Sequence, residues 1–234
     1  MQIKPMNIFS ILHKKYGNLN WWPVDKKYHE KNNSDPRFEI IVGAILTQNT
    51  GWNNVEKAII NLKLKSNLKI KKILEIDINK LKDIIKPSGF FNQKAERLKN
   101  ISSFFYNEFS GNLNNFFNRE LNIIREELLS LNGIGPETAD SILLYAGNLP
   151  IFVVDAYTKR LCERIPLTNS QSYDDVQKYF EKELKKNYTN KDLVNTYNEL
   201  HAQIVIFSKD YCKKKPKCFN CPLGKYCNYK KKSF

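Results

Sequence analysis

Apolar residues recur at three- and four-residue spacing along almost all of this 234-residue chain, and this periodicity constrains the fold more than any other feature. Such spacing places apolar side chains on one face of a helix. Residues 151–154 have the β-branched composition of a strand, but four residues are too few to found a sheet. The sequence therefore predicts an all-α fold, with helices over residues 7–16, 38–48, 52–64, 70–76, 78–85, 92–109, 119–131, 137–146, 156–164, 173–186 and 191–209.

We expect these helices to form two domains with a cleft between them. The first, residues 35–148, begins at Ser34-Asp35-Pro36, which is typical of a helix start. The second combines residues 1–34 with residues 149–234. No fixed-period repeat or long low-complexity linker marks the boundary, so this division rests on the helical pattern alone.

The formal net charge is +14, from 38 Lys and Arg against 24 Asp and Glu. Such an excess favours a polyanionic partner, nucleic acid first, because binding releases counterions from the phosphates. A general enrichment in Lys, Asn and Ile would raise the charge equally well. No apolar stretch approaches the roughly 20 residues of a membrane span, and no signal peptide is recognisable. We therefore expect a cytoplasmic protein that does not bind membranes.

A glycine hairpin separates two of the predicted helices. Gly133, Ile134 and Gly135 turn the chain, and Pro136 opens the next helix. The glycines permit positive φ and a close approach of the backbone to a partner. N–H groups at the following helix start form an anion site that could hold one DNA phosphate, while Ile134 packs inward. An ordinary tight turn between two helices is the simpler interpretation of Gly-x-Gly alone.

Four of the five cysteines, Cys212, Cys218, Cys221 and Cys227, follow the spacing C-x5-C-x2-C-x5-C. Four thiolates in so short a span indicate a metal site, because a reducing cytoplasm disfavours two disulfides. The pattern lacks the second C-x2-C of a zinc ribbon, although zinc stays possible. The fifth, Cys162, is expected to be a buried apolar residue of a helix.

Several separated segments together resemble the helix-hairpin-helix DNA glycosylases of the endonuclease III superfamily. The hairpin is followed, one helix later, by IFVVDAYTKRL, with an aspartate at a helix start. FEIIVGAILTQNTGWNNVEKA resembles the early buried helix of that family, and PSGFFNQKAERLKNI resembles its G-(Y/F)-x-N-x-K-A helix. With the cysteines, these matches extend from Phe38 to Cys227. The resemblance implies an enzyme of base excision repair that acts on double-stranded DNA containing damaged bases, as a monomer.

The resemblance implies that Asp155 is catalytic. Cleavage of an N-glycosidic bond builds positive charge on the sugar of a flipped nucleotide. A fixed carboxylate stabilises that charge and can orient or deprotonate water. Capping of the helix that begins at Ala156 is the alternative role for the same residue. The resemblance also implies a [4Fe–4S] cluster on the four cysteines, with a structural role. The first gap has five residues where the family commonly has six, so zinc stays the alternative.

Glu137 stands where bifunctional members of this family carry a lysine, in G-x-G-x-K-T-A. That lysine attacks the sugar, forms a Schiff base and leads to strand cleavage. A carboxylate cannot form an imine, so we expect base removal by water without strand cleavage. Glu137 could also help to stabilise the cationic sugar, or could simply favour the helix start. The alternatives are a glycosylase/AP lyase acting on oxidised pyrimidines and abasic sites with another lysine, and a DNA-binding module without catalysis.

Members that lack this lysine and begin with Trp-Trp-Pro look like 3-methyladenine DNA glycosylases, and Trp21-Trp22-Pro23 is present here. Alkylated purines are cationic and stack on aromatic faces. Trp21, Trp22 and Trp52 are therefore candidates for a base pocket, against the alternative of ordinary packing.

Two further residues match the resemblance. Gln48 corresponds to a residue that enters the DNA stack and fills the gap left by the flipped nucleotide, although a surface glutamine in a loop has simpler explanations. Lys94 could contact a phosphate.

Overall fold

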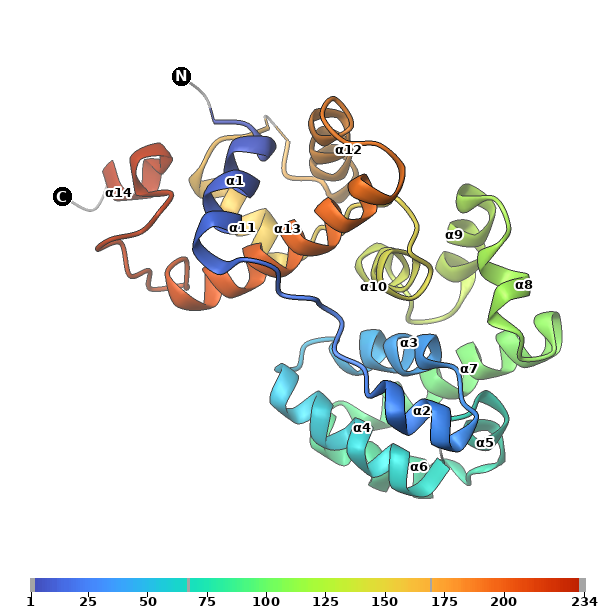
Figure 1. The fold of residues 1–234 in the computed structure, drawn as a ribbon. Helices are drawn as coiled ribbons and strands as arrows, with labels where there is room; N and C mark the ends of the chain where they lie inside the picture. Colours follow the sequence, from blue (N-terminus) through green and yellow to red (C-terminus); the bar gives the residue numbers. More distant parts are fainter. Residues whose placement is uncertain (1–2, 67, 169, 232–234) are drawn as a thin grey trace. The chain divides into compact units, whose positions relative to one another are not determined.

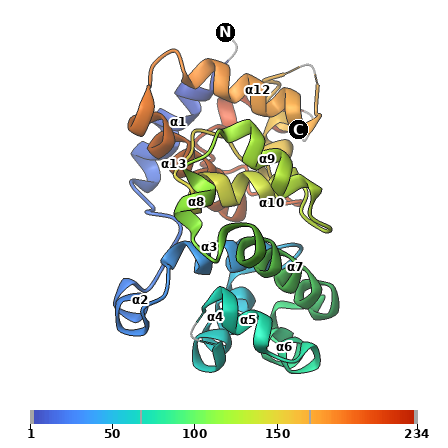
Figure 2. The same ribbon diagram turned by 90° about the vertical axis from the view of Figure 1, so that its right-hand side faces the viewer.

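The computed structural model describes residues 3–66, 68–168 and 170–231, which form two compact units (Figures 1 and 2). One unit spans Trp22–Gly147, and the other joins Met1–Trp21 to Asn148–Phe234. The backbone of the described ranges forms helices and no strand, which confirms the prediction of an all-α fold. No described helix is both long and apolar enough to cross a bilayer.

The central unit is a succession of short helices. They are α2 (Lys26–Asn32), α3 (Pro36–Leu46), α4 (Trp52–Ser66), α5 (Ile70–Glu75), α6 (Ile78–Ile85), η1 (Lys86–Ser88, 3-10), α7 (Phe91–Phe109), α8 (Leu113–Phe117), α9 (Leu121–Ser130), α10 (Pro136–Ser141) and η2 (Ile142–Ala146, a π-helix). Helix α3 packs against α4, α7 and η2, and every residue from Phe38 to Leu46 is buried. The side chain of Asp35 caps α3 and Pro36 begins it, as the sequence predicts.

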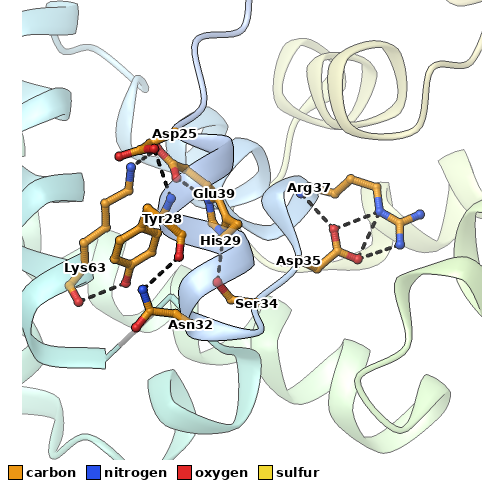
Figure 3. A network of polar contacts seen from close by, with 9 residues as sticks. All are labelled: Asp25, Tyr28, His29, Asn32, Ser34, Asp35, Arg37, Glu39 and Lys63. Carbon is orange, nitrogen blue, oxygen red and sulfur yellow. Dashed lines mark hydrogen bonds and ion pairs between the residues drawn. The ribbon is translucent and has the colours of Figure 1, made fainter.

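Helix α2 lies in the central unit because polar side chains tie it to α3 and α4 (Figure 3). Tyr28 donates a hydrogen bond to the carbonyl oxygen of Lys63 (3.0 Å). The buried pair His29 Nε2 and Glu39 Oε2 are 2.5 Å apart, and Lys63 Nζ lies 2.9 Å from the other oxygen of Glu39. The predicted division put residues 22–34 with the chain ends, whereas the contacts of the structure group them with the central residues.

The other unit is built around the 21-residue helix α13 (Asn190–Asp210). Helices α1 (Pro5–Tyr16) and α11 (Ala156–Arg164) pack against it, and α12 (Tyr173–Leu184) packs against both of them (Figure 1). The chain ends with η3 (Gly224–Tyr226) and α14 (Asn228–Lys231).

The strand-like residues 151–154 are extended and buried but form no sheet. Helix α12 supplies their hydrogen-bond partners: Phe152 N–H donates to Glu181 (2.9 Å), and the Phe152 carbonyl accepts from Gln177 (2.6 Å). The Phe152 ring stacks on Phe180 at a centroid distance of 4.7 Å. This anchored segment leads directly into Asp155.

Candidate functional site

The glycine hairpin joins α9 to α10 and uses its two glycines differently. Gly133 has a φ of +81°, where glycine is favoured, while Gly135 has an ordinary φ of −93° as the residue preceding α10. Ile134 is buried, as predicted. A Cβ at Gly135 would meet no atom within 4 Å. Within the described ranges the N–H of Gly135 donates to no acceptor. Open space therefore faces this backbone segment.

A buried ion pair fixes the angle between the two helices of the hairpin. Arg125 of α9 donates from Nε to Asp140 Oδ1 of α10 at 2.7 Å, and from its Nη2 to Oδ2 at 3.1 Å. Asp140 is fully buried. No periodicity or motif of the sequence predicts this pair, because an arginine and an aspartate 15 residues apart meet only after the hairpin closes.

Glu137 lies in the first turn of α10 and is exposed. The helix predicted over residues 137–146 continues as the π-helix η2 rather than as regular α-helix. A negative side chain in the first turn interacts favourably with the helix dipole.

Gln48 follows α3, and both polar atoms of its side chain are hydrogen-bonded, Nε2 to the hairpin and Oε1 to α7. Its Nε2 donates to the Gly133 carbonyl (3.0 Å) and to Thr138 Oγ1 (2.9 Å). Its Oε1 accepts a short hydrogen bond from Arg97 of α7. The stem of Arg97 lies over Gly133, where an added Cβ would come within 2.1 Å of Arg97 Nε. Sequence reasoning missed Arg97, which only the fold brings to the hairpin.

Lys94 cannot contact a phosphate as predicted, because its side chain is completely buried. Its ammonium group donates to the carbonyls of Leu46 (2.8 Å) and Ser88 (2.7 Å) and to Thr50 Oγ1 (2.7 Å). Burial, and then the charge of Arg97, lowers the pKa of Lys94 to about 8. The residue therefore joins the end of α3, the following loop and η1.

Two of the three candidate pocket tryptophans form one aromatic cluster in the central unit. The Trp22 ring meets Trp52 edge-on at 5.3 Å and Tyr145 at 5.6 Å. Gly43 of α3 leaves the room for Trp22, since an added Cβ would lie 2.6 Å from its ring. Trp22 and Trp52 are half-buried. Trp21 belongs to the other unit.

Asp155 caps α11, as the alternative role for this residue predicts. Its Oδ1 accepts from Thr158 N (2.7 Å) and Thr158 Oγ1 (2.9 Å), and its Oδ2 lies 3.6 Å from His201 Nε2 of α13. Burial alone would raise the pKa of Asp155, but His201 and the two bonds from Thr158 outweigh it and hold the pKa below its usual value. The carboxylate is thus ionised and fixed, although nearly enclosed.

The four clustered cysteines line a single pocket in the unit that contains α11. None is in a disulfide, and burial, followed by the neighbouring cysteine thiols, raises the pKa of Cys221. Arg164 of α11 donates to Cys212 Sγ (3.2 Å) and to the Lys213 carbonyl (2.8 Å). In the described ranges no three His, Cys, Asp or Glu side chains are arranged as metal ligands. The donor set suits an iron–sulfur cluster or zinc.

The fifth cysteine, on α11, and the lysines of the cysteine loop differ in their exposure to solvent. Cys162 is buried, as predicted, and burial raises the pKa of its thiol to about 12. The loop lysines Lys213, Lys214, Lys215 and Lys217 are exposed.

Comparison with known proteins agrees with this geometry. Residues 42–186 match the model of the HhH-GPD superfamily of base excision DNA repair proteins. A Methanocaldococcus jannaschii protein, provisionally named a DNA repair glycosylase, is 46% identical over 223 residues, 94% of each chain. Endonuclease III of Rickettsia felis is 30% identical over 207 residues, covering 85% of this chain and 90% of its own.

Two solved structures are also similar. The H. pylori 3-methyladenine DNA glycosylase MagIII, bound to 1,N6-ethenoadenine, has a TM-score of 0.73 and 34% identity, covering 88% of this chain and 98% of its own. A trapped endonuclease III–DNA covalent intermediate has a TM-score of 0.74 at 21% identity, covering 99% of each chain, and so shows a shared fold. The chain therefore belongs to the helix-hairpin-helix, HhH-GPD superfamily of base excision DNA repair proteins.

Proposed function

We propose that this DNA glycosylase hydrolyses the N-glycosidic bond of an alkylated purine and leaves the abasic strand uncleaved. The observation that carries the proposal is Glu137, which is exposed in the first turn of α10 where a lyase would hold its amine. A carboxylate cannot attack the sugar to form an imine. The glutamate instead places negative charge where a cationic sugar or base would be stabilised.

Lys94 cannot replace the missing amine. It is completely buried, and its three hydrogen bonds use the three donors of the ammonium group. Reaching a sugar would require it to abandon all three acceptors and its enclosure. This contact set supports hydrolysis over the alternative of a glycosylase/AP lyase that uses this lysine.

Asp155 is proposed to stabilise the positive charge that develops on the sugar as the base leaves, and to orient the attacking water. Thr158 and His201 hold it in one rotamer and in its ionised form. Since the carboxylate already carries its charge, no proton has to leave it before the reaction. A preorganised charge of this kind costs no rearrangement in the transition state.

The aromatic cluster of Trp22, Trp52 and Tyr145 is proposed to bind the flipped base, with Trp21 as a further candidate. A methylated purine is cationic, and π faces attract cations. The similar H. pylori protein is a 3-methyladenine DNA glycosylase with an ethenoadenine bound, which supports a purine substrate.

The partner is proposed to be double-stranded DNA with a damaged base. The open space at Gly135 leaves room for a phosphate at the hairpin backbone, with Gly133 and Ile134 shaping the turn. Solved endonuclease III structures of the same fold contain DNA. Gln48 is proposed to fill the gap in the duplex.

Cys212, Cys218, Cys221 and Cys227 are proposed to bind a [4Fe–4S] cluster, with zinc as the alternative. The group would supply structural closure of the loop rather than chemistry on DNA. Arg164 holds the loop through Cys212 and Lys213. Broad visible absorption of the purified protein, with stoichiometric iron, distinguishes the cluster from colourless zinc.

Methylated duplex DNA tests the activity directly. We expect release of free 3-methyladenine, abolished by Asp155→Asn, and no borohydride-trapped protein–DNA complex. A trapped complex on an abasic or thymine-glycol duplex would instead establish the lyase class. Tight DNA binding with no base released from alkylated, oxidised and mismatched substrates would establish a binding module.

A further inference from the structure

Arg97 contacts both Gln48 and the hairpin, and the proposed function leaves it without a role. It comes from α7, is half-buried, and places its stem over Gly133. A guanidinium group offers five N–H donors. In the part of the chain that the structure describes, the polar contact of this guanidinium is the bond to Gln48 Oε1, and no carboxylate lies within salt-bridge distance. Most of its donors and its full charge are thus uncommitted beside the hairpin.

Gln48 cannot enter a DNA duplex while its present contacts hold. Both donors of its amide and its acceptor are engaged, by Gly133, Thr138 and Arg97. Departure of Gln48 would leave the guanidinium without its acceptor. A half-buried cation in that position requires another negative or polar partner. In a DNA complex, a phosphate bound at the hairpin would be the anion nearest to the Arg97 guanidinium.

We propose that Arg97 latches Gln48 to the hairpin in the absence of DNA, and that a DNA phosphate takes over the guanidinium when Gln48 moves into the duplex. The exchange replaces a bond to a neutral amide with a bond to an anion, which is stronger. It couples two events, phosphate binding and the release of Gln48 from the hairpin, through one side chain. This inference rests on the proposed function, because it assumes that Gln48 enters DNA.

The latch is tested without DNA by a double-mutant cycle. Arg97→Met keeps an apolar stem over Gly133 and removes the donors, while Gln48→Ala removes the acceptor. In urea unfolding we expect the double variant to be less destabilised than the sum of the two single variants, by about tenfold in the unfolding equilibrium constant. Additive effects would overturn the latch.

The phosphate contact is tested by the salt dependence of binding to a duplex with a tetrahydrofuran abasic analogue. Arg97→Met should lower the slope of log K against log salt by about 0.9, the value for one phosphate, whereas Arg97→Lys should keep it. Lys72→Met is the control, because it removes one exposed, ion-paired charge on α5 and should leave the slope unchanged. An unchanged slope in Arg97→Met would overturn the phosphate step.

These measurements do not depend on base release. If methylated DNA yields no free base while the cycle and the slope behave as expected, the proposed activity is wrong and the latch stands. If base is released but the slope and cycle show no effect, the latch is wrong and the activity stands. Thermal unfolding of Arg97→Met and Arg97→Lys confirms that each variant folds.

Discussion

Replacing Lys94 by methionine tests whether this lysine stabilises the fold or contacts a DNA phosphate. The substitution keeps the length and apolar stem of the side chain but removes the ammonium group and its three hydrogen bonds. Ser88 O and Thr50 Oγ1 keep each other as partners at 2.5 Å. The Leu46 carbonyl, at the end of α3, loses its bond to Lys94 (2.8 Å). An acceptor left unsatisfied in a buried place costs about 1–3 kcal/mol.

Removal of a buried charge offsets part of that loss, and two broken charge-assisted bonds to Thr50 and Ser88 add to it. We therefore expect Lys94→Met to destabilise the fold by about 2–3 kcal/mol, which corresponds to about 4–12 °C in Tm for a chain of this size. Urea unfolding followed by circular dichroism measures the change. Lys72→Met, whose partner Glu75 is also exposed, should change the free energy of unfolding by less than about 0.5 kcal/mol.

Lys94→Met should leave the slope of log K against log salt for DNA binding unchanged, because a completely buried ammonium group neutralises no phosphate. A refuting result is an intact free energy of unfolding together with a slope reduced by about 0.9. That outcome would return Lys94 to the DNA-contact role that its place in the sequence motif predicts.

Four further substitutions test the hairpin, its buried ion pair and the carboxylate. Gly133→Ala should cost about 1–2 kcal/mol because of its positive φ and the overlying arginine, while Gly135→Ala should leave urea unfolding within about 0.5 kcal/mol yet weaken DNA binding. Asp140→Asn should cost about 3 kcal/mol by breaking the buried pair with Arg125, measured in the same way; a loss below about 1 kcal/mol would contradict that reasoning. Because the folded pKa of Asp155 is lowered, its contribution to stability should be fully present above an unfolded pKa of about 3.9 and be lost as pH falls through the folded value. Asp155→Asn should therefore flatten the acid limb of the stability curve.

Helical periodicity is sufficient to predict the all-α class of the fold, since α3, α7 and α13 bury the residues that their apolar spacing indicates. It failed for α2, whose sequence KKYHEKN has almost no apolar residues and is held by the polar network of Figure 3. It also failed for the short aromatic helix α8, which is too brief to show a period. Helix α2 is held by contacts with α3 and α4, whereas α8 packs against its chain neighbours α7 and α9.

In the candidate site, too, local sequence predicts some features, whereas others depend on tertiary packing. The turn at Gly133 and the cap at Asp155 follow from local chemistry, and both appear where the sequence puts them. His201 and Arg97 reach their partners only through tertiary packing, 46 and 49 residues away in the chain from Asp155 and Gln48. Lys94 is buried rather than at a phosphate, because a motif match says nothing about which way a side chain points. Burial is decided by the whole fold.

Helix α11 carries two different structural tasks at its two ends. Asp155 caps its first turn, and Arg160 and Arg164 near its last turn hold the cysteine loop through the backbone and sulfur of Cys212. Nine residues of α-helix form a rod of about 13.5 Å. Such a short, continuous rod transmits a tilt at one end to the other. The cysteine loop is therefore bonded to the same nine-residue helix whose first turn Asp155 caps.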